Sequence, residues 1–340
     1  MSTELPLVTV VTPSYNQADF IEETICSVFR QEYPNIEHLV MDGGSTDGTV
    51  EILKKYQSKY NLKWISEADS GQSDALNKGF RRASGAIIGW LNSDDTYMPD
   101  AIQTAVEYLA ANPASGWAYG DGYWIDETSR VLSEKYSGPY SLANLVYKGM
   151  YVTQPSMFIH KATLDKVGYL DESIHTTMDY DFCLRLGYHS DAVYIPQKLS
   201  TRRLHSEAKT EAVSVNFYDD AIRSMDKLFA RADLPDDVMA LRDDAYARRH
   251  MIGGYQAFSA GQYERARNLL EASLALRPKY LQKEGLLMRL LILESYFGLT
   301  WLTPGHSRRQ AEQKYAAEHG NVYVNWSLSE PTVQNAMAPR

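Results

Sequence analysis

Residues 86–95 read AIIGWLNSDD. The first half is a short apolar run, which is typical of a buried strand, and the second half ends in the acidic pair Asp94 and Asp95. Open α/β sheets bind their ligands at the carboxyl ends of strands, where this pair falls. Carboxylate oxygens there suit Mg²⁺ or Mn²⁺, which take substrate phosphates as further ligands. The stretch therefore predicts metal-assisted chemistry on a phosphate-bearing substrate. The alternative is that Asp95 caps a helix beginning near Pro99.

Three further segments show the same alternation of apolar runs and polar loops. Residues 7–12 (LVTVVT) precede residues 13–16 (PSYN), and residues 36–41 (IEHLVM) precede residues 42–48 (DGGSTDG). Residues 69–79 (DSGQSDALNKG) lead into the strand quoted first. The repeated order of strand, polar loop and helix predicts a parallel sheet whose polar loops converge on one edge.

Together, and in this order, these motifs resemble those of glycosyltransferase family 2, a large family of inverting enzymes, over residues 7 to 210 or so. The resemblance implies the GT-A fold, a Rossmann-like mixed α/β sheet of nucleotide-diphospho-sugar transferases. It also implies transfer of a sugar from a nucleoside-diphosphate sugar, with UDP or dTDP favoured, in surface polysaccharide biosynthesis. The implied acceptor is a hydroxyl of a glycan, a glycoprotein or a lipid-linked acceptor, and the implied cofactor is a divalent metal, Mn²⁺ or Mg²⁺.

The resemblance places the nucleotide against the first two polar loops. Pro13 and Tyr15 match the loop beside the base and ribose, and Asp42 matches the aspartate that accepts a hydrogen bond from the base. Asp74 matches an acidic residue of the same pocket. The alternatives are structural: Asp42 would cap the turn at residues 43–44, and Asp74 would be a favourable charge at a helix N-terminus.

The same resemblance assigns the first-quoted stretch to the leaving group. Asp94 matches the metal-binding carboxylate of the family's acidic motif, while Asn92 and Ser93 are expected to contact the nucleotide. The motif usually begins with aspartate, so Asn92 brings a hydrogen-bonding amide without a charge, and a weaker metal site is expected.

A downstream segment, residues 201–205 (TRRLH), resembles a family loop that closes over the diphosphate. Arg202 or Arg203 is expected to contact phosphate, since guanidinium groups bind phosphate well. His205 is expected to contact phosphate or to complete the metal shell; the alternative is a solvated histidine.

The catalytic base is expected in residues 177–186 (TMDYDFCLRL). The family places an acidic pair before an aromatic residue, and the second acid of that pair is the base. Met178 replaces the first acid, so Asp179 alone is in register. The alternative is that Asp179 is only a helix N-cap. Residues 154–156 (QPS) match a family segment near the acceptor.

The composition excludes some classes of protein. The chain has 340 residues and a formal net charge of −9, which argues against a nucleic-acid binder. Its N-terminus shows no basic, apolar and small-residue signal pattern. We therefore expect a cytoplasmic protein, either soluble or peripheral at the inner face of the membrane.

The pattern becomes helical after the resemblance ends. Residues 1–212 are interpreted as the catalytic domain, residues 213–328 as a helical C-terminal region, and residues 329–340 as a flexible tail. Residues 254–278 resemble one tetratricopeptide-type repeat, which either packs on the catalytic domain or docks a membrane or partner protein. The apolar residues 286–302 predict a core helix, with an interfacial membrane helix as the alternative.

Two other functions are the alternatives to sugar transfer. A sugar nucleotidyltransferase should show a glycine-rich, basic loop after the first strand, but residues 13–16 contain neither glycine nor lysine. A catalytically degenerate transferase, acting as a nucleotide-binding scaffold, would explain Asn92 and Met178. It predicts nucleotide binding without turnover.

Overall fold

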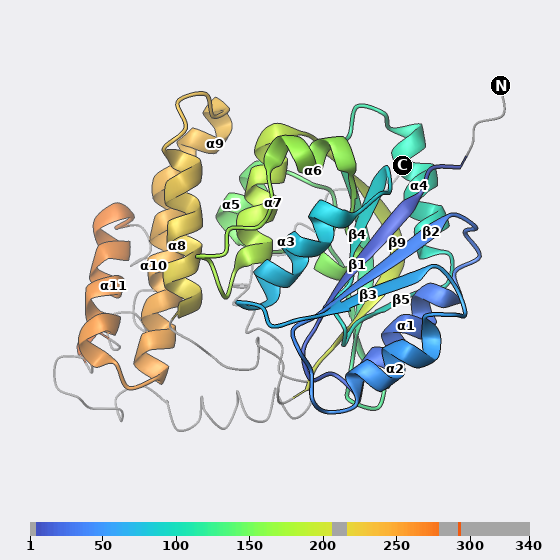
Figure 1. The fold of residues 1–340 in the computed structure, drawn as a ribbon. Coiled ribbons are helices and arrows are strands. Elements are labelled where there is room, and N and C mark those ends of the chain that lie inside the picture. The colour runs from blue at the N-terminus through green and yellow to red at the C-terminus, as the bar shows by residue number, and fades with distance from the viewer. Residues whose placement is uncertain (1–4, 206–215, 279–291, 294–340) are drawn as a thin grey trace, which may run out of the picture.

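The structure, a computed structural model, describes residues 5–205, 216–278 and 292–293. In this part of the chain one mixed sheet has the strand order β3-β2-β1-β4-β8-β6-β9-β5, and β7 pairs with β6 (Figure 1). The strands are β1 Val8–Ser14, β2 Ile36–Asp42, β3 Leu62–Ser66, β4 Ile87–Trp90, β5 Thr96–Tyr97, β6 Trp117–Ile125, β7 Val131–Lys135, β8 Phe158–His160 and β9 Ala192–Arg203.

The first four strands form the parallel half of the sheet. β1 pairs with β2 and β4, and β2 pairs with β3, all in parallel. β1 is buried along its whole length, as expected for a strand covered on both faces. The carboxyl ends of these strands meet at one edge of the sheet, so the predicted convergence of the polar loops is confirmed.

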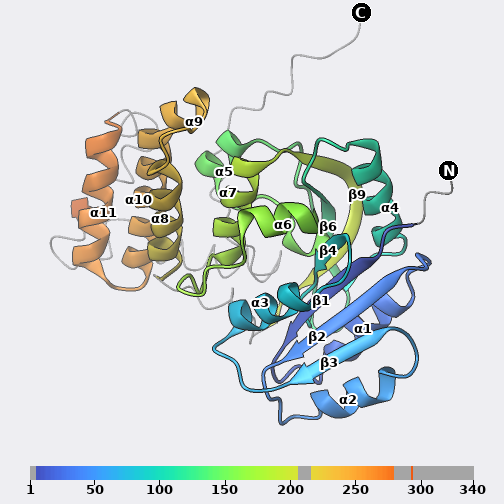
Figure 2. The ribbon, with the colours of Figure 1, turned by 45° about the horizontal axis from the view of Figure 1, so that its top comes forward.

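Helices cover both faces of this sheet (Figure 2). α3, α5 and α7 share a core with Val11 and Trp90, whereas α4 packs with Val8 and Val10 on the opposite face. α1 and α2 complete that second layer. The helices of this half are α1 Ile21–Phe29, α2 Thr49–Tyr56, α3 Gln72–Arg82, α4 Ala101–Ala111, α5 Leu142–Lys148, α6 Lys161–Val167 and α7 Met178–His189, with the short 3₁₀ helix η1 Gln154–Ser156.

The strand β9 is longer than its sequence suggests. Pro196 interrupts the run of apolar residues that begins at Ala192, but β9 continues past it to Arg203. The pairing of β6 with β9 shifts register on both sides of Asp121, and this irregularity accommodates the missing N–H of Pro196. As a result Thr201 pairs with Thr96 of β5, and their hydroxyl oxygens lie 2.7 Å apart. The segment expected to be a closing loop is therefore partly a strand, and it is fixed beside the acidic pair.

The C-terminal helices pack on the end of the molecule formed by α5 and α7 (Figure 1). They are α8 Asn216–Phe229, α9 Asp236–Ala240, α10 Arg242–Ser259 and α11 Tyr263–Leu276. α10 and α11 turn at Gly261, whose φ of 75° favours glycine, and the Ser273 hydroxyl donates to the Ala247 carbonyl at 2.7 Å. Residues 254–278 therefore comprise the end of one helix, a turn and a second helix.

One core runs through both regions, because Met225 and Leu228 of α8 belong to the same cluster as Phe182 of α7. The expected domain boundary at residue 212 falls between the described ranges. The expected tail at 329–340 and most of residues 286–302 also lie outside the described residues. Within the described residues, no helix combines the length and apolarity needed to cross a membrane.

Candidate active site

The loops after β1 and β2 are joined by hydrogen bonds at the edge of the sheet. The Asn16 N–H donates to the Ser45 hydroxyl at 2.7 Å, and the Thr46 N–H donates to the Asn16 side-chain oxygen at 2.9 Å. Asn16 has a φ of 51°, which asparagine tolerates better than most residues. This joint buries Pro13 and leaves Tyr15 61% exposed, so the tyrosine ring lies open at the rim.

Asp42 closes the turn that follows β2. It is 2% exposed, and its Oδ2 accepts hydrogen bonds from the Gly44 N–H at 3.2 Å and the Ser45 N–H at 2.9 Å. The Ser66 hydroxyl donates to the same oxygen at 2.6 Å. The structural interpretation of Asp42 thus holds in this conformation, and a nucleotide base would have to share its carboxylate with the turn.

Asp74 lies in the first turn of α3, at the same edge. It accepts a hydrogen bond from the Ser70 N–H at 3.0 Å, and the Lys78 ammonium lies 3.2 Å away. These contacts, led by the Ser70 hydrogen bond, lower the pKa of Asp74. The carboxylate is therefore charged and lies over a helix N-terminus, beside a small polar pocket that Glu172 and His175 also line.

Asn92 links several elements of the site. Its side-chain oxygen accepts hydrogen bonds from Gln72 and from the Trp90 indole, both at 2.9 Å. Its amide nitrogen donates to Asp95 and to Gln154, both at 3.1 Å. An aspartate at this position could not donate to either partner, so the amide suits this network. In this conformation the Asn92 side chain therefore bonds to other residues of the protein, whereas the sequence predicts a contact with the nucleotide.

Asp94 and His205 face each other at the edge of the sheet. Asp94 Oδ2 and His205 Nε2 are 3.0 Å apart, and the imidazole packs against the Phe20 ring at 4.7 Å between centroids. The Asp94 side chain is 22% exposed and that of His205 is 4% exposed. Ser93, beside them, is buried, and its carbonyl accepts a hydrogen bond from the Thr24 hydroxyl at 2.8 Å.

Asp94 and His205 could supply only part of the coordination shell of a divalent cation. The described residues contain no cluster of three or more His, Cys, Asp or Glu side chains able to hold a metal. One carboxylate and one imidazole leave most coordination positions open. Mg²⁺ and Mn²⁺ suit such a site, because they keep water and accept phosphate oxygens as further ligands.

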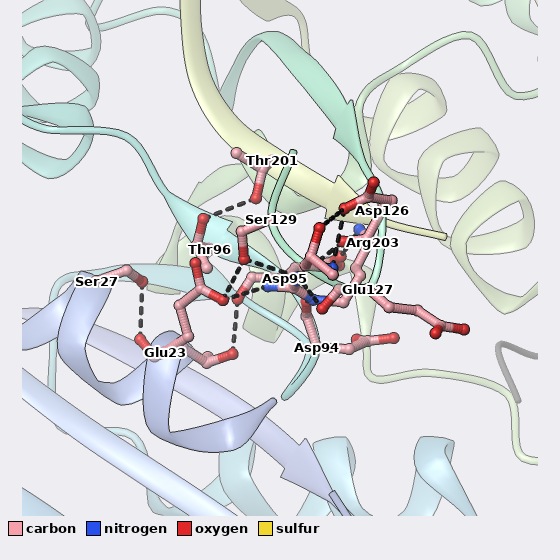
Figure 3. A network of polar contacts seen from close by, with 12 residues as sticks. Glu23, Ser27, Asp94, Asp95, Thr96, Asp126, Glu127, Ser129, Thr201 and Arg203 are labelled. Carbon is pink, nitrogen blue, oxygen red and sulfur yellow. Dashed lines mark hydrogen bonds and ion pairs between the residues drawn. The ribbon is translucent and has the colours of Figure 1, made fainter. Parts of the chain in front are cut away.

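Asp95 and Arg203 form the structural centre behind this pair (Figure 3). Asp95 Oδ1 accepts a hydrogen bond from the main-chain N–H of Arg203 at 3.0 Å, and the alternative interpretation, that Asp95 caps the following helix, is wrong. That helix, α4, begins at Ala101 instead, after Asp100. Burial and the neighbouring Asp94 carboxylate raise the pKa of Asp95 to about 7.

The Arg203 side chain is 0% exposed and is held from three directions. Its Nη2 pairs with Glu23 of α1 at 2.6 Å, its Nη1 donates to the Asp126 carbonyl at 2.9 Å, and its Nε donates to the Asp94 carbonyl at 2.9 Å. This arginine therefore orients the main chain of Asp94, and it cannot reach a phosphate without leaving the network. Of the two arginines predicted to contact phosphate, Arg202 is the better placed.

We expect Arg203→Met to destabilise the protein by about 2–4 kcal/mol, because buried carbonyls and Glu23 lose their donors. Urea unfolding measures the change. Arg202→Met, on the neighbouring and half-buried position of the same strand, is the control and should change the unfolding free energy far less. Equal losses for the two variants would contradict the anchoring role of Arg203.

Asp179 is the second residue of α7, and it reaches the same edge from the other side. Thr177 occupies the N-cap position, and Asp179 Oδ1 accepts a hydrogen bond from the Tyr180 N–H at 2.8 Å. The Ser73 hydroxyl donates to the Met178 sulfur at 2.9 Å, which joins the beginnings of α3 and α7. Burial raises the pKa of Asp179, and the positive charge of Arg202 partly opposes that shift.

Arg202 is near enough to two acidic groups of the site to act on them electrostatically. Its charge lowers the pKa of both Asp95 and Asp179, and its guanidinium lies 5.7 Å from the centroid of the Trp124 ring. A cation therefore faces the carboxylate proposed as the base and the loop proposed to hold the metal. This arrangement fits a substrate that carries negative charge between them.

The fold is shared with solved transferases. The structure of S. aureus TarS 1-349 in complex with UDP-GlcNAc superposes with a TM-score of 0.66 at 20% identity, covering 90% of this chain and 92% of that chain. The mannosyltransferase PcManGT from Pyrobaculum calidifontis, in complex with GDP-Man and Mn²⁺, gives a TM-score of 0.57 at 18% identity. The match covers 87% of this chain and 86% of that chain. The predicted fold class is confirmed: a GT-A sheet followed by a helical region.

Sequence comparison identifies the family. The model described as glycosyl transferase family 2 matches residues 9–167. An uncharacterized glycosyltransferase of Mycobacterium tuberculosis is 32% identical over 197 residues, which are 57% of this chain and 73% of that protein. Chondroitin synthase of Escherichia coli is 28% identical over 204 residues, 60% of this chain but 30% of the synthase. The chain belongs to glycosyl transferase family 2 and is a glycosyltransferase.

Proposed function

We propose that this glycosyltransferase is an inverting enzyme. It moves a sugar from a UDP- or dTDP-sugar to a hydroxyl of a glycan, glycolipid or glycoprotein acceptor during surface polysaccharide biosynthesis. The observation that carries the proposal is that the Arg202 charge acts both on Asp179 and on Asp95, the neighbour of Asp94, at the edge of the sheet where the polar loops meet. The relatives support the substrate class, since they include chondroitin synthase and a Bacillus subtilis protein named as a putative teichuronic acid biosynthesis glycosyltransferase. TarS was crystallised with UDP-GlcNAc.

The proposed chemistry is a single displacement. Asp179 takes the proton of the acceptor hydroxyl, and the oxygen attacks the anomeric carbon from the face opposite the diphosphate. Asp94 and His205 would hold a divalent cation, Mn²⁺ or Mg²⁺, which when bound neutralises charge on the leaving diphosphate. Arg202 adds positive charge on the same side. Pro13, Tyr15, Asp42 and Asp74 border the proposed nucleotide pocket.

The scaffold hypothesis remains the main competitor. Its support was the pair of departures at residues 92 and 178. In the structure Asn92 makes hydrogen bonds that an aspartate could not make, and Met178 packs against Ser73. Both departures thus have structural roles that do not require loss of activity. Docking of a membrane or partner protein by the helical region, and its relation to tetratricopeptide repeats, stay predictions.

The proposal is tested by incubating the protein with UDP-, dTDP- and GDP-sugars and Mn²⁺ or Mg²⁺, and measuring release of nucleoside diphosphate. We expect UDP or dTDP to be released from one donor, and release to stop when a chelator removes the metal. The scaffold hypothesis predicts binding of UDP by calorimetry without release, with or without added acceptor extracts. Release of pyrophosphate would instead indicate a nucleotidyltransferase.

A further inference from the structure

The segment that precedes the helix of Asp179 is held by a carboxylate from the C-terminal helices. Asp220 of α8 accepts hydrogen bonds on its Oδ2 from the His175 N–H at 3.0 Å and the Thr176 N–H at 2.8 Å. The Thr176 hydroxyl donates to the same oxygen at 2.7 Å. One carboxylate oxygen therefore fixes two successive peptide groups, those of residues four and three positions before Asp179.

Asp220 is buried and charged, as this role requires. The residue is 2% exposed, and its Oδ1 pairs with Arg223 on the same helix. Burial by itself would raise the pKa of Asp220, but the hydrogen bonds from Thr176 and the Arg223 charge outweigh it, so the pKa is lowered. The carboxylate is therefore ionised at neutral pH, and charge-assisted hydrogen bonds of this kind are stronger than neutral ones.

The start of α7 needs such support from outside. Thr177, at the N-cap position, makes no side-chain capping hydrogen bond. A second C-terminal helix reaches the same place, because the Arg249 guanidinium of α10 lies 5.0 Å from the centroid of the Tyr180 ring. At the other end of α7, the Tyr188 hydroxyl bonds to Asp233. Asp233 lies between α8 and α9, so the C-terminal region contacts α7 at both ends.

We propose that Asp220 is a positioning residue, which holds residues 175–176 so that Asp179 points at the acceptor hydroxyl. The inference rests on the proposed function, because it takes Asp179 as the base. The inference gives the helical region a part in catalysis, because Asp220 of α8 would support the segment that leads to Asp179. A displacement of the base by about 1 Å can lower turnover by about 100-fold, so a carboxylate that touches no substrate can still govern the rate.

Two variants of Asp220 and one matched control test the proposal in the full-length protein. Asp220→Ala removes the acceptor and should lower kcat by about 100-fold. Asp220→Asn keeps an oxygen at the Oδ2 position and should recover much of that loss. Asp219→Asn is the control, because Asp219 is the adjacent residue of α8 and pairs with Arg265 of α11 instead. It should leave kcat unchanged.

Two further readouts separate positioning from general damage. UDP binding with Mn²⁺, measured by calorimetry, should stay within about twofold in all three variants. The loops after β1 and β2, Asp94 and His205 are unchanged in them, and Asp220 holds His175 by its main-chain N–H, so the His175 side chain that lines the pocket beside Asp74 stays in place. Amide hydrogen exchange should quicken in peptides covering residues 173–182 of Asp220→Ala and not in peptides covering residues 36–48. Unchanged kcat in Asp220→Ala, or a parallel loss of kcat and UDP affinity, overturns the proposal. Failure of the proposed function looks different, because the wild-type protein would then release no nucleoside diphosphate, and failure of the base assignment would leave Asp179→Asn with full turnover.

Discussion

Replacing Asp179 by asparagine should lower kcat by about 10³-fold while leaving UDP affinity within about twofold. An asparagine oxygen can still accept the Tyr180 N–H, so the start of α7 keeps its geometry, but an amide cannot take a proton from the acceptor. The measurement is nucleoside diphosphate release with the donor found in the panel, together with calorimetric titration of UDP in Mn²⁺.

The pH dependence of the wild-type enzyme gives an independent check on this assignment. A base must be ionised to act, and burial raises the pKa of Asp179 above its ordinary range. Activity should therefore be full above that raised pKa and should fall as the pH drops through it. The acid limb should lie above the range of an exposed aspartate, and Arg202→Met should move it higher still, because the opposing charge is lost.

Asp181→Asn is the control variant for Asp179→Asn, because it removes another carboxylate from the same helix. Asp181 is buried and pairs with Arg185 at 2.8 Å, so its replacement should lower the unfolding free energy. The folded enzyme should keep its kcat. If Asp179 is only a charge at a helix N-terminus, Asp179→Asn would cost about 0.3–1 kcal/mol of stability and leave kcat intact.

The parallel half of the fold could be predicted because its signals are local. The runs at residues 7–12 and 87–90 are rich in apolar and β-branched residues, as buried parallel strands are, and the run at 36–41 is apolar apart from Glu37 and His38. Each run is followed by its polar loop. Edge strands carry weaker signals. Of the five residues of β3 only Leu62 is buried, and β5 has only Thr96 and Tyr97.

The interior of the site could not be predicted, because its contacts join distant residues. Glu23 and Arg203 are 180 positions apart, and in the sequence Glu23 is only an acidic residue in the first turn of a helix. Arg203 was grouped with Arg202 because both are basic and adjacent. Successive residues of a strand point to opposite sides, however, so only a prediction that extended β9 past Pro196 would have separated them. Asp220, likewise, lies 41 positions after Asp179 in the numbering, on a helix that looks ordinary.

Replacing Asp94 by asparagine should remove the metal dependence of nucleotide binding. Asparagine is a poor ligand for a hard cation, so UDP affinity should no longer rise when Mn²⁺ is added, and turnover should fall by at least about 100-fold. The unfolding free energy should barely change, because the asparagine oxygen can still accept a hydrogen bond from His205. The measurement is a calorimetric UDP titration with and without Mn²⁺, combined with urea unfolding.

His205→Gln tests the other half of the pair. Loss of one neutral ligand should weaken the effect of Mn²⁺ on UDP binding less than loss of the Asp94 charge does. The competing interpretation is that Asp94 and His205, 3.0 Å apart, form only a structural contact at the edge of the sheet. In that case both variants would lose stability, and Mn²⁺ would still strengthen UDP binding in each. A stable Asp94→Asn protein that binds UDP equally with and without Mn²⁺ decides for the metal site, because the hydrogen bond survives in that variant and only the charged ligand is gone.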